Sequence, residues 1–91
     1  MSVKISQRIK CYSILKHFGH ETQVDKTLEE LCELDEALRF GNLNEIIGEL
    51  ADVEIMIEQI KESYGVQSHV DKTIDIKIER TQQRIKDGYY E

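Results

Sequence analysis

Apolar side chains recur every three or four residues along almost the whole chain, which is the spacing of one face of an α-helix. Four such stripes predict helices over residues 3–17, Thr22–Phe40, 44–64 and His69–Lys86. Their inward-facing positions are Ile5, Ile9, Tyr12 and either Leu15 or Lys16; Val24, Leu28, Leu31, Leu34 and Leu38; Ile46, Leu50, Val53, Ile57 and Ile60; and Val70, Ile74, Ile78, Thr81 and Ile85. The chain is therefore expected to be all-α.

Residues that favour helix ends separate the four stripes. Glycine follows each stripe, as is common at helix C-termini: Gly19, Gly41, Gly65 and Gly88. Candidate N-caps are Ser2, Asn42 or Asn44, and Ser68. Because the intervening turns are short, neighbouring helices should run antiparallel. The pattern predicts one domain over residues 1–91, a compact four-helix bundle of antiparallel helices.

Length and charge narrow the possible partners. A chain of 91 residues buries a limited share of its surface, so we expect a homodimer or homotetramer to complete the core. The net charge of −6 argues against a nucleic-acid-binding surface. No apolar run reaches the roughly 20 residues of a membrane span, and the N-terminus lacks the apolar core of a signal peptide. We expect no membrane partner and a cytoplasmic location.

Two acidic pairs flank the turn between the second and third predicted helices. Glu30 and Glu33 lie three residues apart, and so do Glu49 and Asp52, so each pair projects from one side of its helix. If the helices pack together, four carboxylates converge on one volume. A hard divalent cation is the usual partner of such a group.

The position of each acid relative to the apolar stripe tests this hypothesis. Glu49 lies close to the apolar face of its helix, whereas Glu30, Glu33 and Asp52 lie at the border, and Glu58 lies opposite the core where a solvated acid belongs. An acid on the core-facing side needs a partner. The alternative is two solvated acidic faces, because acids are frequent enough here to produce this spacing by chance.

A cationic ridge follows the apolar stripe of the last predicted helix. Lys77, Arg80 and Arg84 lie on one border of that stripe. They could neutralise nearby acids, or they could hold the phosphates of a substrate that the cation also binds. Neither acidic pair contains histidine, and all-oxygen ligation suits Mg²⁺ or Mn²⁺.

These residues resemble the signature of the MazG-like, all-α nucleoside triphosphate pyrophosphohydrolases, a superfamily that includes dimeric dUTPases and phosphoribosyl-ATP pyrophosphohydrolases. The signature is E-E-x-x-E, a gap, then E-x-x-D, and it is similar to Glu29–Leu34 (EELCEL) followed by Gly48–Val53 (GELADV). The segment Phe18–Gln23 and the basic element Lys77–Arg80 are similar to two further family segments. The resemblance spans residues 18–84.

The resemblance implies a Mg²⁺-dependent enzyme that cleaves an NTP or dNTP to the monophosphate and pyrophosphate, a housekeeping activity on the nucleotide pool. It implies metal ligation by Glu30, Glu33, Glu49 and Asp52, phosphate contacts from Lys77, Arg80 and Arg84, and base or sugar contacts from Gln23 and Phe18. Lys26 could also touch phosphate, although an i,i+4 pair with Glu30 is its simpler role. Some members carry aromatic residues at positions that contact the base, and this chain contains no tryptophan.

One acid is needed to accept the proton of the attacking water. Glu45 lies on the same helix edge as Glu49 and is favoured over Glu29, which points away from its stripe. Two alternatives stay open at this point. One is a non-enzymatic helical interaction module whose acids and cations form structural ion pairs. The other is an enzyme of the same superfamily that resembles phosphoribosyl-ATP pyrophosphohydrolase.

Overall fold

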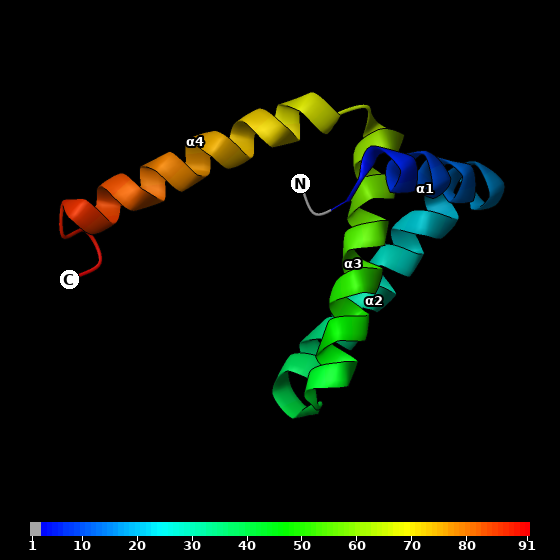
Figure 1. Cartoon of the computed structure of the whole chain (residues 1–91), viewed down its shortest axis with the longest axis horizontal. Coiled ribbons are helices and arrows are strands. Elements are labelled where there is room, and N and C mark those ends of the chain that lie inside the picture. Colours follow the sequence, from blue (N-terminus) through cyan, green and yellow to red (C-terminus); the bar gives the residue numbers. More distant parts are fainter. Residues whose placement is uncertain (1–2) are drawn as a thin grey trace.

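Short turns join four helices in the computed structural model, which describes residues 3–91 (Figure 1). They are α1 (Ile5–Phe18), α2 (His20–Phe40), α3 (Leu43–Tyr64) and α4 (Gln67–Lys86). No strand occurs between residues 3 and 91. The expected all-α architecture of four helices is confirmed.

The turns follow the capping chemistry expected at two of the three junctions. The side chain of Asn42 accepts a 2.9 Å hydrogen bond from the backbone amide of Glu45, which confirms one of the two predicted caps of α3. Gly65 ends α3 in the left-handed conformation with φ of 66°, where residues with a Cβ are strained.

The predicted cap of the fourth helix is wrong. Helix α4 begins at Gln67, so Ser68 lies inside its first turn. The amide of Val66 closes the end of α3 by donating to the Lys61 carbonyl, and the Val66 carbonyl already accepts the first bond of α4. The preceding helix therefore starts α4 without a side-chain cap. Ser2, the predicted cap of α1, lies outside the described residues.

Helices α2 and α3 run antiparallel and form a hairpin (Figure 1). The contact between them is partly polar. Ala37 of α2 and Val53 and Met56 of α3 are buried. Beside them the Gln23 amide donates a 2.8 Å hydrogen bond to the Gln59 side chain, and both glutamines are buried. Each buried amide thereby has a partner, which removes most of the desolvation cost of placing it there.

Because polar residues occupy part of the contact between α2 and α3, several apolar residues of the predicted stripes face solvent instead. The buried positions of α2 are Gln23, Glu30 and Ala37, whereas Leu31 of α2 and Leu50 of α3 stay exposed. The stripe positions of both helices are therefore only partly correct. The reason is that the contact line passes along the border of each stripe rather than through its middle.

Glu58 is the clearest error of the sequence prediction, since it is only 2% exposed. Its carboxylate lies 2.7 Å from Arg8 Nε of α1 and 3.2 Å from Lys61 Nζ. The Gln67 amide donates to this carboxylate and, over 3.0 Å, to the Tyr12 hydroxyl. Helix α1 covers the side of α3 that carries Glu58, and a comparison of α2 and α3 alone assigns that side to solvent.

Helix α4 extends away from the other three helices (Figure 1). Its backbone packs against the C-terminal end of α3, and its first residue, Gln67, also bonds to Tyr12 of α1. None of its residues is buried: of the positions predicted to face inward, Val70 is half-buried and the other four are exposed. These positions are Val70, Ile74, Ile78, Thr81 and Ile85. Within the described part of the chain, no helix is both long and apolar enough to span a membrane.

We predict that Glu58→Ala lowers the free energy of unfolding by about 2 kcal/mol at pH 7, because it leaves Arg8 and Lys61 without their buried partner. Burial raises the pKa of Glu58, but the hydrogen bond from Gln67 and the charges of Lys61 and Arg8 outweigh it and lower that pKa overall. A lowered pKa stabilises the fold above the usual carboxyl pKa of 4.5 and loses this effect as the pH falls through the lowered value.

Urea unfolding followed by circular dichroism between pH 7 and pH 3 measures this effect. The destabilisation by Glu58→Ala should shrink as the pH falls. Glu62→Ala, at an exposed glutamate of the same helix, should change stability by less than about 0.5 kcal/mol at every pH. An equal loss for Glu58→Ala at pH 7 and pH 3 would contradict the role of the ionised carboxylate.

Candidate metal centre

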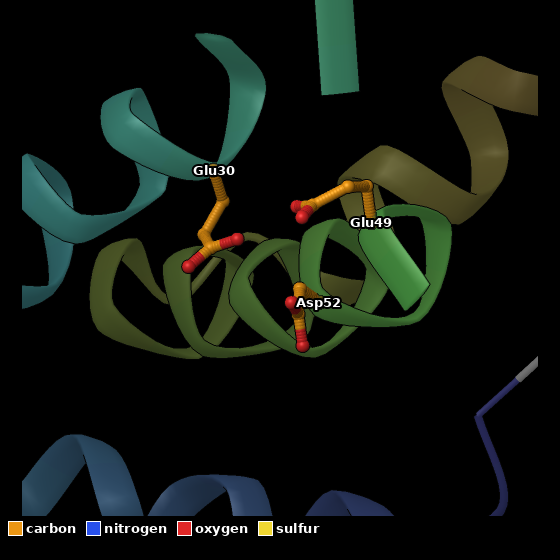
Figure 2. Close-up of side chains that lie close together, drawn as sticks. All are labelled: Glu30, Glu49 and Asp52. Atoms are coloured by element: carbon orange, nitrogen blue, oxygen red, sulfur yellow. The ribbon is translucent and has the colours of Figure 1, made fainter. Parts of the chain in front are cut away.

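Three carboxylates from the two helices of the hairpin gather near its middle (Figure 2). Helix α2 supplies Glu30, and α3 supplies Glu49 and Asp52 from one side of the helix, three residues apart. One oxygen of each carboxylate lies within 4.8 Å of one oxygen of each of the others. The convergence of these three acids, which the spacing predicts only if the helices pack, is present in the structure.

Two buried oxygens of this cluster accept no hydrogen bond from a donor group in residues 3–91. Glu30 is 5% exposed, and its Oε2 is buried without a hydrogen bond, as is Oε2 of Glu49. A buried carboxylate oxygen without a donor is costly. A cation bound between the two helices would satisfy both oxygens, so the donor set fits a metal ion.

The surroundings of the cluster shift the pKa values of Glu30 and Glu49 in opposite directions. A hydrogen bond from Lys26 lowers the pKa of Glu30, and the Lys26 charge adds to this effect against the opposing effect of burial. Desolvation raises the pKa of Glu49, and the negative charges of Glu33, Glu30 and Asp52 raise it further. Without a cation, Glu49 therefore takes up a proton at a higher pH than Glu30 does.

An open cavity of about 460 Å³ lies beside the cluster, at the turn end of the hairpin. Its lining is rich in carboxylates and consists of Glu33, Glu36, Ala37, Phe40, Gly41, Glu45, Gly48, Glu49 and Asp52. Glu33, the fourth predicted ligand, lies on this cavity but outside the group of three oxygens. Glu45, the predicted proton acceptor, also lies on it and accepts a 3.0 Å hydrogen bond from the Asn42 amide.

Lys26 and Gln23 lie along the same helix but have different surroundings. Lys26 Nζ lies 3.0 Å from Glu30 Oε1 and 3.6 Å from Glu29 Oε2. The simpler role predicted for Lys26, the i,i+4 pair with Glu30, is thus confirmed. Gln23 is buried against Gln59 and is not among the lining residues of the cavity, so its predicted contact with a base or sugar finds no support here.

The predicted phosphate-binding cations do not reach the acids within one chain. Lys77, Arg80 and Arg84 lie on α4, which extends away from the hairpin, and none of them lines the cavity (Figure 1). The Arg84 guanidinium instead lies 4.8 Å from the centre of the Tyr89 ring. Phe18, the other residue expected near the base, is 54% exposed at the end of α1.

Sequence reasoning missed two residues of this site. Phe40, which is 85% exposed, and Glu36 both line the cavity. Phe40 is the last residue of α2, and an aromatic side chain directly before a helix-ending glycine is the signal that could have identified it. Glu36 follows Glu33 by three residues and continues the same edge of the helix.

Comparison with known proteins adds no relative. The chain matches no protein-family model, no curated protein and no solved structure. The geometry of the acidic cluster and the residues of this chain are therefore the basis for inferring a function.

We predict that Glu49→Gln weakens Mn²⁺ binding at least about tenfold, because it removes one charged ligand. Without metal, the same variant should unfold at the wild-type temperature or above it, because repulsion from Glu33, Glu30 and Asp52 is relieved. Thermal unfolding with EDTA and with Mn²⁺, together with calorimetric titration, measures both effects. Binding of Mn²⁺ should raise the unfolding temperature of the wild type and not that of Glu49→Gln.

Glu62→Gln is the matched control, since Glu62 is an exposed glutamate of the same helix. It should bind Mn²⁺ as the wild type does. If Glu49→Gln destabilised the metal-free protein and bound Mn²⁺ normally, the cluster would be a structural ion-pair network rather than a cation site.

Proposed function

We propose that this chain is a Mg²⁺-dependent nucleoside triphosphate pyrophosphohydrolase of the MazG-like kind. The observation that carries the proposal is the convergence of Glu30, Glu49 and Asp52 with two buried oxygens that have no partner. The agreement of these three residues with the E-x-x-E and E-x-x-D signature supports the same conclusion.

The residues of the cluster define which cation they would hold. All three donors are carboxylates, and hard oxygen donors suit Mg²⁺ and Mn²⁺ rather than a soft metal. Glu30, Glu49 and Asp52 would bind the ion. Glu33, the fourth expected ligand, lines the cavity next to Glu49 and Asp52. A divalent cation in this position supplies charge neutralisation for phosphate oxygens and lowers the pKa of a water molecule.

The reaction is the transfer of a nucleotidyl group to water. Water attacks the α-phosphorus and forms a new P–O bond, while the bond from that phosphorus to the bridging oxygen of the β-phosphate breaks. Glu45 accepts the proton of the attacking water, and its hydrogen bond from Asn42 keeps the carboxylate at the edge of the cavity. The products are a nucleoside monophosphate and pyrophosphate.

The charge of the cavity explains a strict need for metal. Five carboxylates line it, those of Glu33, Glu36, Glu45, Glu49 and Asp52, and no lysine or arginine does. A triphosphate would be repelled from such a surface at close range. Divalent cations would reverse that repulsion, so substrate should enter only as a metal complex or after the cluster is loaded.

A second function has one observation in its favour. Helix α4 extends freely and its three cations lie away from the acids, as would suit a non-enzymatic interaction module. That alternative gives no role to the convergence of Glu30, Glu49 and Asp52. We therefore favour the enzyme.

We predict pyrophosphate release from at least one NTP or dNTP in the presence of Mg²⁺ or Mn²⁺, and none with EDTA. Glu49→Gln should lower turnover on the order of a hundredfold or more, because it removes a ligand of the ion that activates water. Glu62→Gln should keep wild-type turnover. A coupled pyrophosphate assay over all eight substrates measures these rates.

The same panel contains the outcomes that count against the proposal. No release from any substrate, with folding confirmed by circular dichroism, would exclude a general nucleotide pyrophosphohydrolase. Equal turnover by wild type and Glu49→Gln would place any activity at another site or in a contaminant. Release of phosphate without pyrophosphate would show that a different bond is cleaved.

A further inference from the structure

A lysine side chain contacts the acidic cluster directly. Lys26 lies one helical turn before Glu30 on α2, and its Nζ is 3.0 Å from Glu30 Oε1. We propose that Lys26 is the internal counterion of the empty cluster: its ammonium balances part of the acidic charge in the metal-free protein and leaves Glu30 when a divalent ion binds. Lys26 thereby stabilises the empty site and lowers its affinity for metal. This inference rests on the cation-binding part of the proposed function and not on the reaction.

Glu30 is the acid of the cluster that most needs a positive partner. It is only 5% exposed, and it reaches from α2 toward the helix that carries Glu49 and Asp52 (Figure 2). Its Oε2 accepts no hydrogen bond from residues 3–91, whereas its Oε1 is paired with the Lys26 ammonium. A buried carboxylate without a counter-charge is strongly unfavourable. The ammonium is therefore what makes the burial of the Glu30 charge tolerable in the absence of a metal.

The two other cations of the hairpin helices form ion pairs with acids outside the cluster. Arg39 Nε lies 3.0 Å from Asp35 Oδ1. Lys61 Nζ lies 3.2 Å from Glu58 Oε2. No lysine or arginine of residues 3–91 lines the cavity beside the cluster. Lys26 therefore supplies the positive charge that the hairpin places against these acids.

The position of Lys26 at the edge of the cluster allows its ammonium to leave. The Lys26 side chain is 48% exposed, whereas the Glu30 side chain is 7% exposed. On the outer side its Nζ lies 3.6 Å from Oε2 of Glu29, a side chain that is 66% exposed. After displacement, the flexible four-carbon stem lets the ammonium keep water and Glu29 as partners. No buried charge is then left unpaired, so the usual cost of breaking a buried ion pair does not arise.

The charges determine the direction in which Lys26 shifts metal binding. Glu30, Glu49 and Asp52 contribute three carboxylates to the cluster, and a divalent ion cancels two negative charges. The attraction between the ammonium and the cluster is therefore stronger in the empty site than in the loaded site. An interaction that favours the empty form lowers the affinity for the ion by the corresponding factor. Removal of the Lys26 charge should therefore tighten metal binding.

This arrangement makes loading of the cluster depend on the supply of metal. An internal counterion keeps the site folded when metal is scarce, and the ion must reach a higher concentration before it replaces the ammonium. The simpler alternative is that Lys26 and Glu30 only support α2 as an i,i+4 pair. In that case loss of the pair weakens the fold and does not improve metal binding.

Lys26→Met separates the two roles, because it removes the charge and keeps most of the apolar stem. In EDTA the variant should unfold about 4 °C or more below the wild type, since Glu30 has lost its counter-charge. Calorimetric titration of the same variant should give a Mn²⁺ dissociation constant at least about fivefold lower than that of the wild type. The two shifts favour opposite states of the site, which a purely structural ion pair would not produce.

Two further variants are controls. Arg39→Met removes the same charge from the same helix at the exposed i,i+4 pair with Asp35, and it should leave Mn²⁺ affinity unchanged. Lys26→Arg keeps the positive charge and should bind Mn²⁺ no more tightly than the wild type. If Lys26→Met is unfolded in EDTA, addition of Mn²⁺ should restore its helical circular dichroism, because the ion replaces the lost charge.

The results distinguish failure of this inference from failure of the proposed function. If the wild type binds no Mn²⁺ at millimolar concentrations, both are overturned. If the wild type binds Mn²⁺ and Lys26→Met binds it equally or more weakly, or stays unfolded with saturating Mn²⁺, the role of Lys26 is overturned and the proposed enzyme is not. Tighter binding by Lys26→Met in a protein that releases no pyrophosphate would support the counterion and count against the enzyme.

Discussion

The line of contact between α2 and α3 determines both the core and the candidate metal centre. It contains the apolar residues Ala37, Val53 and Met56, and it also contains a buried amide pair, Gln23 with Gln59. A little further along the same line, Glu30 is buried with one oxygen paired to Lys26 and the other without a partner. A purely apolar contact between α2 and α3 would be more stable, but it would offer no ligands for a cation.

The polar character of this contact has a consequence on the outer surface. With glutamines and a glutamate on the contact line, leucines that fit a helix-helix interface are left on one side of the hairpin. The acidic cavity lies at the border of the contact line, away from those leucines. The exposed leucines and the acidic cavity therefore occupy different parts of the hairpin surface.

The direction of α4 depends on a second polar contact, the cluster around Glu58. This carboxylate joins α1 through Arg8, α3 through Lys61 and α4 through Gln67. Because the three partners come from three different helices, the cluster constrains how α4 leaves α3. The orientation of α4 therefore depends on the buried charge of Glu58, since α4 itself has no buried residue.

The sequence by itself determined the helices, because local periodicity and turn residues act within a few positions. The four stripes, the Asn42 cap and the acids at i,i+3 spacing needed no tertiary information. Only the tertiary structure decided that Glu30, Glu49 and Asp52 meet while Glu33 stays at the cavity edge, that Glu58 is buried, and that α4 leaves the hairpin. The physical reason is that a helical wheel gives each side chain a direction but not a neighbour. Which side of an apolar stripe becomes buried depends on the helices that pack against it, and these come from other parts of the chain.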